Sequence, residues 1–190
     1  MNKLDLAKTT TDLKVLDELS KDKDSDIRYW VAEKNNASPE ILNYLSKDEN
    51  SDVRWVVALN LNTSPETLDY LSKDEVHYVR WGVAYNHNTS TETLDYMSKD
   101  EDRGVRWRVA INPNTTPETL DYMSKDEDSD IRCYVAANPN TTPETLKQMA
   151  LDKDDDEIIY FIKSNPNCSE ETWKYLSAVE LIKSLSKVSI

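Results

Sequence analysis

Residues 105–126 read VRWRVAINPNTTPETLDYMSKD, and close copies of this stretch recur along the chain. The Val/Ile-Arg pair at its start marks a period of 26 residues, because it returns at 27–28, 53–54, 79–80, 105–106 and 131–132. A period of this size is typical of arrays in which each unit buries its apolar face against its neighbours. The sequence therefore predicts a stack of repeats that fills most of the 190 residues.

Each unit is expected to begin with a short helix. In the unit at 62–87, Ser64 is an N-cap residue and Pro65 occupies the first helical position. Leu68 and Leu71 then point inward from this helix. The equivalents of these two leucines are Leu42/Leu45, Leu94/Met97, Leu120/Met123 and Leu146/Met149.

A second helix is expected over about 77–85, after a polar connector at 72–75. Asn86 ends it, because asparagine tolerates the left-handed backbone conformation that is common just past a helix end. The equivalent asparagines are Asn60, Asn112, Asn138 and Asn165. This row is also compatible with a clamp on a peptide backbone, but helix termination already accounts for it.

The fold class that follows is an all-α solenoid of about six two-helix repeats, in a single repeat domain over 1–190. Residues 1–19 resemble the first helix of a degraded unit and are interpreted as an N-terminal cap. The repeats occupy 20–167, and 168–190 are expected to form a longer, more amphipathic capping helix with Trp173, Leu176 and Leu181.

At the level of the pattern VRxxVAxNPxTxPExLxxLxxD, the sequence resembles the leucine-rich repeat variant family, relatives of the HEAT-type α-solenoids. The resemblance covers residues 13–176, and spacing and residue types agree over five units. It implies α-helices alternating with short α- or 3₁₀-helices, stacked into a right-handed superhelix. Some members of the family carry a cysteine-bound iron–sulphur cluster ahead of the repeats. This chain has no N-terminal cysteine, so no cofactor is expected.

The net charge of −13 argues against a nucleic-acid backbone or an anionic membrane as the main partner, and it favours a basic one. Cys133 and Cys168 are far apart and have no ligand-like spacing, which excludes a disulfide framework and a cysteine-rich metal site. No apolar run is long enough for a signal peptide or a membrane span. We therefore expect a soluble, cytoplasmic protein.

Motifs for catalysis are missing from the sequence. There is no Gly-rich phosphate loop and no nucleophile–base motif, and the two histidines, His77 and His87, have no counterparts in other units. Asp-rich connectors such as 126–130 lack the glycine and the final glutamate of a calcium loop. The sequence therefore predicts neither an enzyme nor a dedicated metal site.

The arginine of the repeated pair lies within the packed arc of the second helix on a helical wheel. A buried guanidinium needs a carboxylate or carbonyl partner, and an aspartate recurs in step just before each arginine helix. We expect a structural Arg–Asp ladder between repeats, with an anion-binding row as the alternative. Its members are Arg28, Arg54, Arg80, Arg106 and Arg132 with Asp22, Asp48, Asp74, Asp100 and Asp126.

An aromatic row follows the arginines, and the wheel places it away from the packed arc. A row of exposed indoles would imply a partner; the alternative is that each indole covers the edge of the next repeat. A neighbouring position, which varies freely (Trp30, Val56, Gly82, Arg108, Tyr134 and Phe161), is also expected to face outward. The candidate partner-binding residues are Tyr29, Trp55, Leu59, Trp81, Tyr85, Trp107, Ile111 and Tyr134.

The main functional hypothesis is a scaffold for protein–protein interaction that grips a protein or peptide, with a basic segment, along this strip. The alternative is an acidic nucleic-acid mimic that inhibits a DNA- or RNA-binding protein through the edge formed by Asp48-Glu49 and its equivalents. Direct nucleic-acid binding is the weakest hypothesis, because there is no basic groove. A further tyrosine row on the first helices is interpreted as structural: Tyr44, Tyr70, Tyr96 and Tyr122.

Overall fold

The computed structural model describes residues 2–151 and 156–188, and within these residues it contains fourteen α-helices and no strand. The predicted all-helical repeat fold is confirmed. Both helices of each repeat are α-helical, so the described residues contain no 3₁₀-helix of the kind that the family resemblance allowed. The chain forms two compact units, Met1–Asn114 and Thr115–Ile190, and each is described by itself.

Unit 1 alternates first helices of seven residues with second helices of mostly eight or nine. The described part of this unit consists of α1 Lys3–Thr9, α2 Leu13–Leu19, α3 Ser25–Ala32, α4 Pro39–Leu45, α5 Ser51–Leu59, α6 Pro65–Leu71, α7 His77–Tyr85, α8 Thr91–Met97 and α9 Arg103–Ile111.

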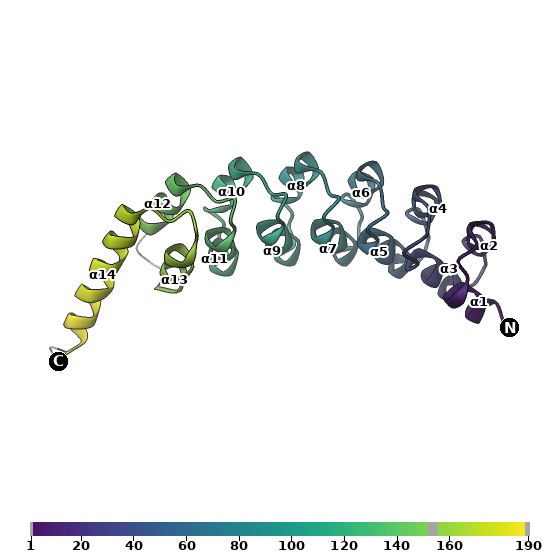
Figure 1. Cartoon of the computed structure of the whole chain (residues 1–190), viewed down its shortest axis with the longest axis horizontal. Coiled ribbons are helices and arrows are strands. Elements are labelled where there is room, and N and C mark those ends of the chain that lie inside the picture. Colours follow the sequence, from purple (N-terminus) through teal and green to yellow (C-terminus); the bar gives the residue numbers. More distant parts are fainter. Residues whose placement is uncertain (1, 152–155, 189–190) are drawn as a thin grey trace. The chain divides into compact units, whose positions relative to one another are not determined.

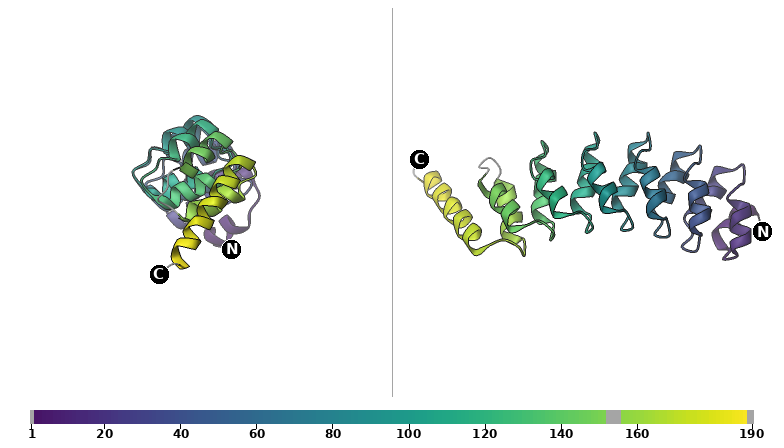
Figure 2. Two further views of the ribbon diagram at one scale, coloured as in Figure 1. Left: turned by 90° about the vertical axis from the view of Figure 1, so that its left-hand side faces the viewer. Right: turned by 90° about the horizontal axis from the view of Figure 1, so that it is seen from above.

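The helices of unit 1 form two rows (Figures 1 and 2), with α2, α4, α6 and α8 in one and α1, α3, α5, α7 and α9 in the other. Consecutive second helices pack on one another along their row. Residues 1–19 hold two helices, not the one that the sequence indicated. Because α1 packs on α3 as a second helix would, this segment is a nearly complete repeat and not half of one.

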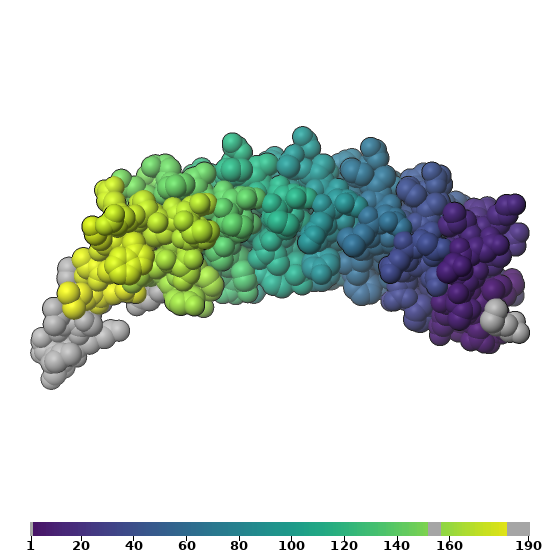
Figure 3. Space-filling view, in the orientation of Figure 1, coloured from purple at the N-terminus to yellow at the C-terminus, as the bar shows by residue number. Residues whose placement is uncertain are grey.

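The core of unit 1 lies between the two rows. Val53, Val57 and Ala58 of α5 are fully buried, and so are Leu68 and Leu71 of α6, which confirms the inward faces predicted for both helices. In the space-filling view the repeats form a continuous surface, and side chains project at intervals along the edge formed by α4, α6 and α8 (Figure 3).

The first helices begin where the sequence indicated. The Ser64 hydroxyl accepts a hydrogen bond from the Thr67 backbone N–H at 3.3 Å, and Pro65 is the first helical residue. Such a cap satisfies one of the N–H groups that a helix start leaves without an intrahelical partner. The same bond is made by Ser38, Ser90, Thr116 and Thr142.

The asparagines that end the second helices do not adopt the left-handed conformation that the sequence indicated. Asn86 has an extended backbone, with φ −71° and ψ 132°, and no described non-glycine residue has a positive φ. Its side-chain amide instead donates to the carbonyls of Ala58 at 2.7 Å and Asn60 at 3.0 Å in the preceding repeat. Asn60, Asn112 and Asn165 bond in the same way. The donors of this row are therefore engaged by the protein's own backbone, which removes the peptide-clamp alternative.

A second asparagine row, which the sequence analysis overlooked, lies two residues further on. The side-chain amide of Asn62 donates to the carbonyl of Ala37 at 3.2 Å, again one repeat back. Its equivalents that also bond to the preceding repeat are Asn36, Asn88, Asn114, Asn140 and Asn167. Two amide side chains per repeat thus fix the spacing between neighbouring repeats.

Unit 2 continues the pattern and ends in a longer helix. Its described helices are α10 Pro117–Met123, α11 Ser129–Ala137, α12 Pro143–Leu151, α13 Asp156–Ser164 and α14 Glu170–Val188. The last of these has 19 residues and packs against α12 and α13. Leu176 is buried there, whereas Trp173 and Leu181 are exposed. Residues 189–190 of the predicted cap lie outside the described residues. None of the described helices is long and apolar enough to cross a membrane.

Candidate binding surface on the second helices

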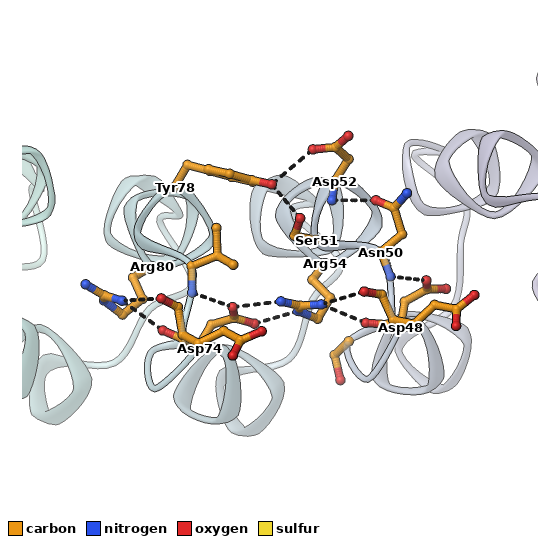
Figure 4. A network of polar contacts seen from close by, with 12 residues as sticks. Asp48, Asn50, Ser51, Asp52, Arg54, Asp74, Tyr78 and Arg80 are labelled. Atoms are coloured by element: carbon orange, nitrogen blue, oxygen red, sulfur yellow. Dashed lines mark hydrogen bonds and ion pairs between the residues drawn. The ribbon is translucent and has the colours of Figure 1, made fainter.

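Three arginines of the ladder, Arg28, Arg54 and Arg80, each join two successive connectors, and Figure 4 shows this for Arg54. Arg54 donates from Nε and Nη2 to the Asp74 carboxylate of the next repeat, at 2.6 and 2.9 Å. Its Nη1 donates to the backbone carbonyl of Asp48, in its own connector, at 2.8 Å. Arg28 with Asp48 and Arg80 with Asp100 repeat this geometry. The carboxylate that pairs with each of these three arginines therefore comes from the following repeat, and not from the connector just before the arginine helix.

The buried charges of the ladder are paired with groups of opposite charge. The Arg54 side chain is only 11% exposed and that of Asp74 7%, and the adjacent carboxylate raises the pKa of Arg54 still further above its usual range. At the N-terminal end Lys3 takes the arginine's place and bonds Asp22 at 2.6 Å, which lowers the pKa of that carboxyl. Arg106 and Arg132 donate to the backbone carbonyls of Asp100 and Asp126.

This pairing argues against two alternative hypotheses, the anion-binding row and the nucleic-acid mimic. The guanidinium groups of Arg28, Arg54 and Arg80 are engaged internally, so they do not form an accessible anion-binding row. The acidic edge is also smaller than the sequence indicated. Asp48 is turned inward to Arg28, whereas Glu49 beside it is 89% exposed. Only the glutamate of each such pair faces solvent, which weakens the case for a nucleic-acid mimic.

The tryptophans of the aromatic row are half-buried on the second helices of unit 1. A Cβ built on Gly82 of α7 would lie only 3.2 Å from Cδ1 of Trp55, so the indole of α5 lies against the next helix. Trp81 and Trp107 are half-buried too, as are Tyr29, Leu59 and Ile111. Trp55 thus covers the edge of the neighbouring repeat, and part of each ring in the row remains accessible.

One group of residues in unit 1 brings several candidate residues together. Tyr85 is 48% exposed and stacks on Trp81, with ring centroids 5.7 Å apart and planes within 9°. The guanidinium of Arg108 lies 4.1 Å from the Trp81 ring centre and 4.0 Å from that of Trp107. We call Trp81, Tyr85, Trp107 and Arg108 the aromatic cluster. Tyr134 is exposed on α11 of unit 2.

The prediction that the variable position faces outward is wrong for two repeats. Val56 is only 5% exposed and Gly82 is buried. The reason is geometric: at about 100° per residue, Val56 lies 60° from Val53 on the far side from Val57, so it extends the packed arc. Variation at this position therefore includes substitutions within the stack, and it is not by itself a sign of recognition.

A pocket of about 660 Å³ opens beside the aromatic row, at the N-terminal ends of α5, α7 and α9. Trp55, Tyr78 and Trp81 supply its aromatic walls. Asp52, Asp102 and Arg103 supply charged groups, and His77 and Gly104 complete the lining. Among the described residues, no group of three or more histidine, cysteine, aspartate or glutamate side chains is placed to hold a metal ion.

Comparison with solved structures identifies the architecture. A structure described as a leucine-rich repeat variant with a novel repetitive structural motif matches 88% of this chain and 71% of its own, with a TM-score of 0.62 and 24% identity. This chain has the leucine-rich repeat variant fold. YibA of Escherichia coli is also similar, at a TM-score of 0.50 and 16% identity over 91% of this chain and 71% of its own. No protein-family model matches the sequence, and no curated protein matches it.

Within the leucine-rich repeat variant fold, the pocket coincides with a break in the repeat pattern. The second helices begin with Ser-Asp at 25–26, 51–52 and 129–130, but with His-Tyr at 77–78 and Arg-Gly at 103–104. None of these residues was among the candidates predicted from the sequence, where His77 stood out only because it has no counterpart in other repeats. An alignment of the repeats with one another would have shown the break, although only the structure shows that both departures line one pocket.

The tyrosine row of the first helices is arranged differently. Tyr44, Tyr70 and Tyr96 are each about half exposed, and lysines of the preceding repeat approach two of them. Lys47 lies 6.0 Å from the ring centre of Tyr70, and Lys73 lies 5.9 Å from that of Tyr96. These rings are separate from one another, which contrasts with the stacked aromatic cluster of the second helices.

Proposed function

We propose that this protein is a non-catalytic scaffold that binds a protein or peptide segment along the second helices of unit 1. The observation that carries the proposal is the aromatic cluster, where Tyr85 is held at 5.7 Å on Trp81 yet remains half exposed. Rigid, partly accessible aromatic and arginine side chains are the residue types that dominate binding energy at protein interfaces.

The repeat spacing suits an extended ligand. Neighbouring helices pack about 8–10 Å apart, and an extended peptide rises about 3.3 Å per residue. One repeat therefore matches about three peptide residues. The net charge of −13 would speed the capture of a basic segment. A cytoplasmic setting, expected from the cysteine usage, is part of the same proposal.

The test compares two tyrosines of similar exposure on opposite rows of helices. Tyr85→Ser removes the accessible ring of the aromatic cluster, and Tyr70→Ser removes a ring of the first-helix row. Both variants and the wild type would be immobilised and exposed to lysate of the source organism, and retained proteins would be identified by mass spectrometry. The proposal expects a protein that the wild type and Tyr70→Ser retain and Tyr85→Ser loses. Equal retention by all three, or equal loss in both variants, would overturn it.

A further inference from the structure

We infer that the pocket at the N-terminal ends of α5, α7 and α9 receives an arginine side chain of the bound partner. The inference deepens the proposed function and rests on it, since the pocket adjoins the aromatic cluster through Trp81.

The pocket exists because one residue of the repeat lacks a side chain. On α7, Tyr78 lies edge-on to Trp55 of the preceding repeat, with ring centroids 6.5 Å apart and planes at 87°. The equivalent residue on α9 is Gly104, and a Cβ built there would lie 3.0 Å from Oδ1 of Asp102 and 3.7 Å from Cδ1 of Trp81. Trp81 therefore has no ring at position 104 to cover it as Tyr78 covers Trp55. The space beyond Gly104 that such a ring would fill is part of the pocket.

The charges around this space favour a cation. Asp52, Asp102 and Arg103 all line this space, so its lining carries two carboxylates and one guanidinium; Arg108, which stacks on Trp81, is not part of the lining. Asp52 accepts a hydrogen bond from the Tyr78 hydroxyl at 3.2 Å, and Asp102 accepts one from the Val105 N–H at 3.1 Å. A carboxylate oxygen can accept more than one hydrogen bond, so both groups retain acceptor capacity.

The protein itself shows which cation suits these indoles. Arg108 places its guanidinium 4.1 Å from the centre of Trp81, so an indole of this row already takes a planar cation on its face. A guanidinium can stack on an aromatic ring and bond a carboxylate in the same plane, which an ammonium group cannot do. A pocket with indole walls and two carboxylates at its rim is therefore suited to arginine more than to lysine.

The direct test uses a small probe and the indole N–H signals in NMR spectra. N-acetyl-arginine amide is titrated into the full chain, with N-acetyl-citrulline amide as the neutral analogue of the same shape. The signals of Trp55 and Trp81 should shift in a saturable way with arginine, while those of Trp30 and Trp173 should stay in place. Citrulline should bind at least about threefold more weakly. Equal shifts with both probes, or no shift at all, would overturn the inference.

Three variants locate the binding. Gly104→Tyr should abolish the shifts, since the new ring would cover Trp81 as Tyr78 covers Trp55 and its Cβ would displace the Asp102 carboxylate. Asp102→Asn should weaken binding while preserving the helix start, because asparagine caps as well as aspartate; Asp24→Asn, at the equivalent cap of α3, is the matched control. Arg103→Gln should tighten binding by removing a like charge. An anion site would respond in the opposite way to Arg103→Gln, and that result would overturn the inference.

The two proposals can fail separately. If Tyr85→Ser loses a captured partner while Gly104→Tyr and Asp102→Asn retain it and arginine binds no better than citrulline, the scaffold stands and the arginine pocket is wrong. If arginine binds as described and no partner depends on Tyr85, the pocket stands and the binding surface is wrong.

Discussion

The arginine that recurs in each repeat owes its importance to the number of segments it joins. Arg54 bonds a carboxylate from the next repeat and a carbonyl from its own connector, and it is almost completely buried. Removing one member of a buried ion pair costs more than the pair contributes, because the remaining charge stays in a poorly solvated place.

We therefore expect Asp74→Ala to lower the free energy of unfolding by about 3 kcal/mol. The adjacent Glu75→Ala is the control, because Glu75 is exposed and shares the connector; it should change stability by less than about 0.5 kcal/mol. Urea denaturation of both variants gives the comparison. Similar losses in the two variants would show that the ladder does not hold the repeats together.

At the scale of the element, no helix of unit 1 could persist alone, since isolated helices shorter than about 12 residues are marginal in water. Their ends therefore matter more than in a long helix. Among the second helices, α7 has Val76 at its N-cap position and so lacks a side-chain cap, whereas Asn50 at the N-cap of α5 accepts from the Asp52 N–H at 2.8 Å.

Val76→Asp should restore the missing cap and raise the free energy of unfolding by about 1 kcal/mol. Asn50→Ala, which removes a cap that is present, should lower it by a similar amount. Thermal unfolding followed by circular dichroism measures both. If Val76→Asp were neutral while Asn50→Ala destabilised, the start of α7 would be satisfied in some other way.

The first turns of the first helices also predict a response to acid. Backbone hydrogen bonds lower the pKa of Glu66 and Glu92, with smaller contributions from the Ser64 hydroxyl to Glu66 and from the Thr91 and Ser90 hydroxyls to Glu92. For Glu40 the hydrogen bond with the Ser38 hydroxyl lowers the pKa most, and the backbone N–H lowers it further. A carboxyl whose pKa is lowered by folding adds stability above its unfolded pKa and loses it as the pH falls through the folded value. A variant with Glu40→Gln, Glu66→Gln and Glu92→Gln should thus be less stable than the wild type at pH 7. The difference in stability should disappear below about pH 4, where the glutamates become protonated. Midpoints of thermal unfolding from pH 7 to 3 test this; a gap that persists at pH 3 would contradict it.

The helices themselves could be predicted because their signals are local. Ser64, Pro65 and Leu68 determine a start and an inward face by spacing alone. The role of Asn86 could not be predicted, because an asparagine at this position suits both the end of a helix and a hydrogen bond to the Ala58 carbonyl of the preceding repeat. The pocket could not be predicted either. Tyr78 and Gly104 are visible departures from the pattern, but whether both line one pocket depends on how far one repeat is displaced from the next.

At the scale of the whole molecule, contacts that join each repeat to the one before it make the array nearly one-dimensional. The ladder has the same 26-residue period, so one whole repeat can be removed and the remaining arginines and aspartates stay in register. After deletion of 62–87, Arg54 would meet Asp100 in place of Asp74.

Deletion of 62–87 should give a folded protein with a lower unfolding midpoint and nearly unchanged helicity per residue. Deletion of 62–84, which is three residues shorter, breaks the register and should cause a large loss of helicity. Circular dichroism and size-exclusion chromatography distinguish the two. Equal tolerance of both deletions would mean that register between repeats is not what holds the stack together.

The two asparagine rows have a mechanical consequence. Each amide bonds only one repeat back, so a force applied to the ends of unit 1 would act on a series of similar links. Each link that breaks frees 26 residues, or about 80 Å of extended chain once the folded spacing is subtracted. When a single molecule is stretched, this array should therefore unfold one repeat at a time and lengthen in equal steps.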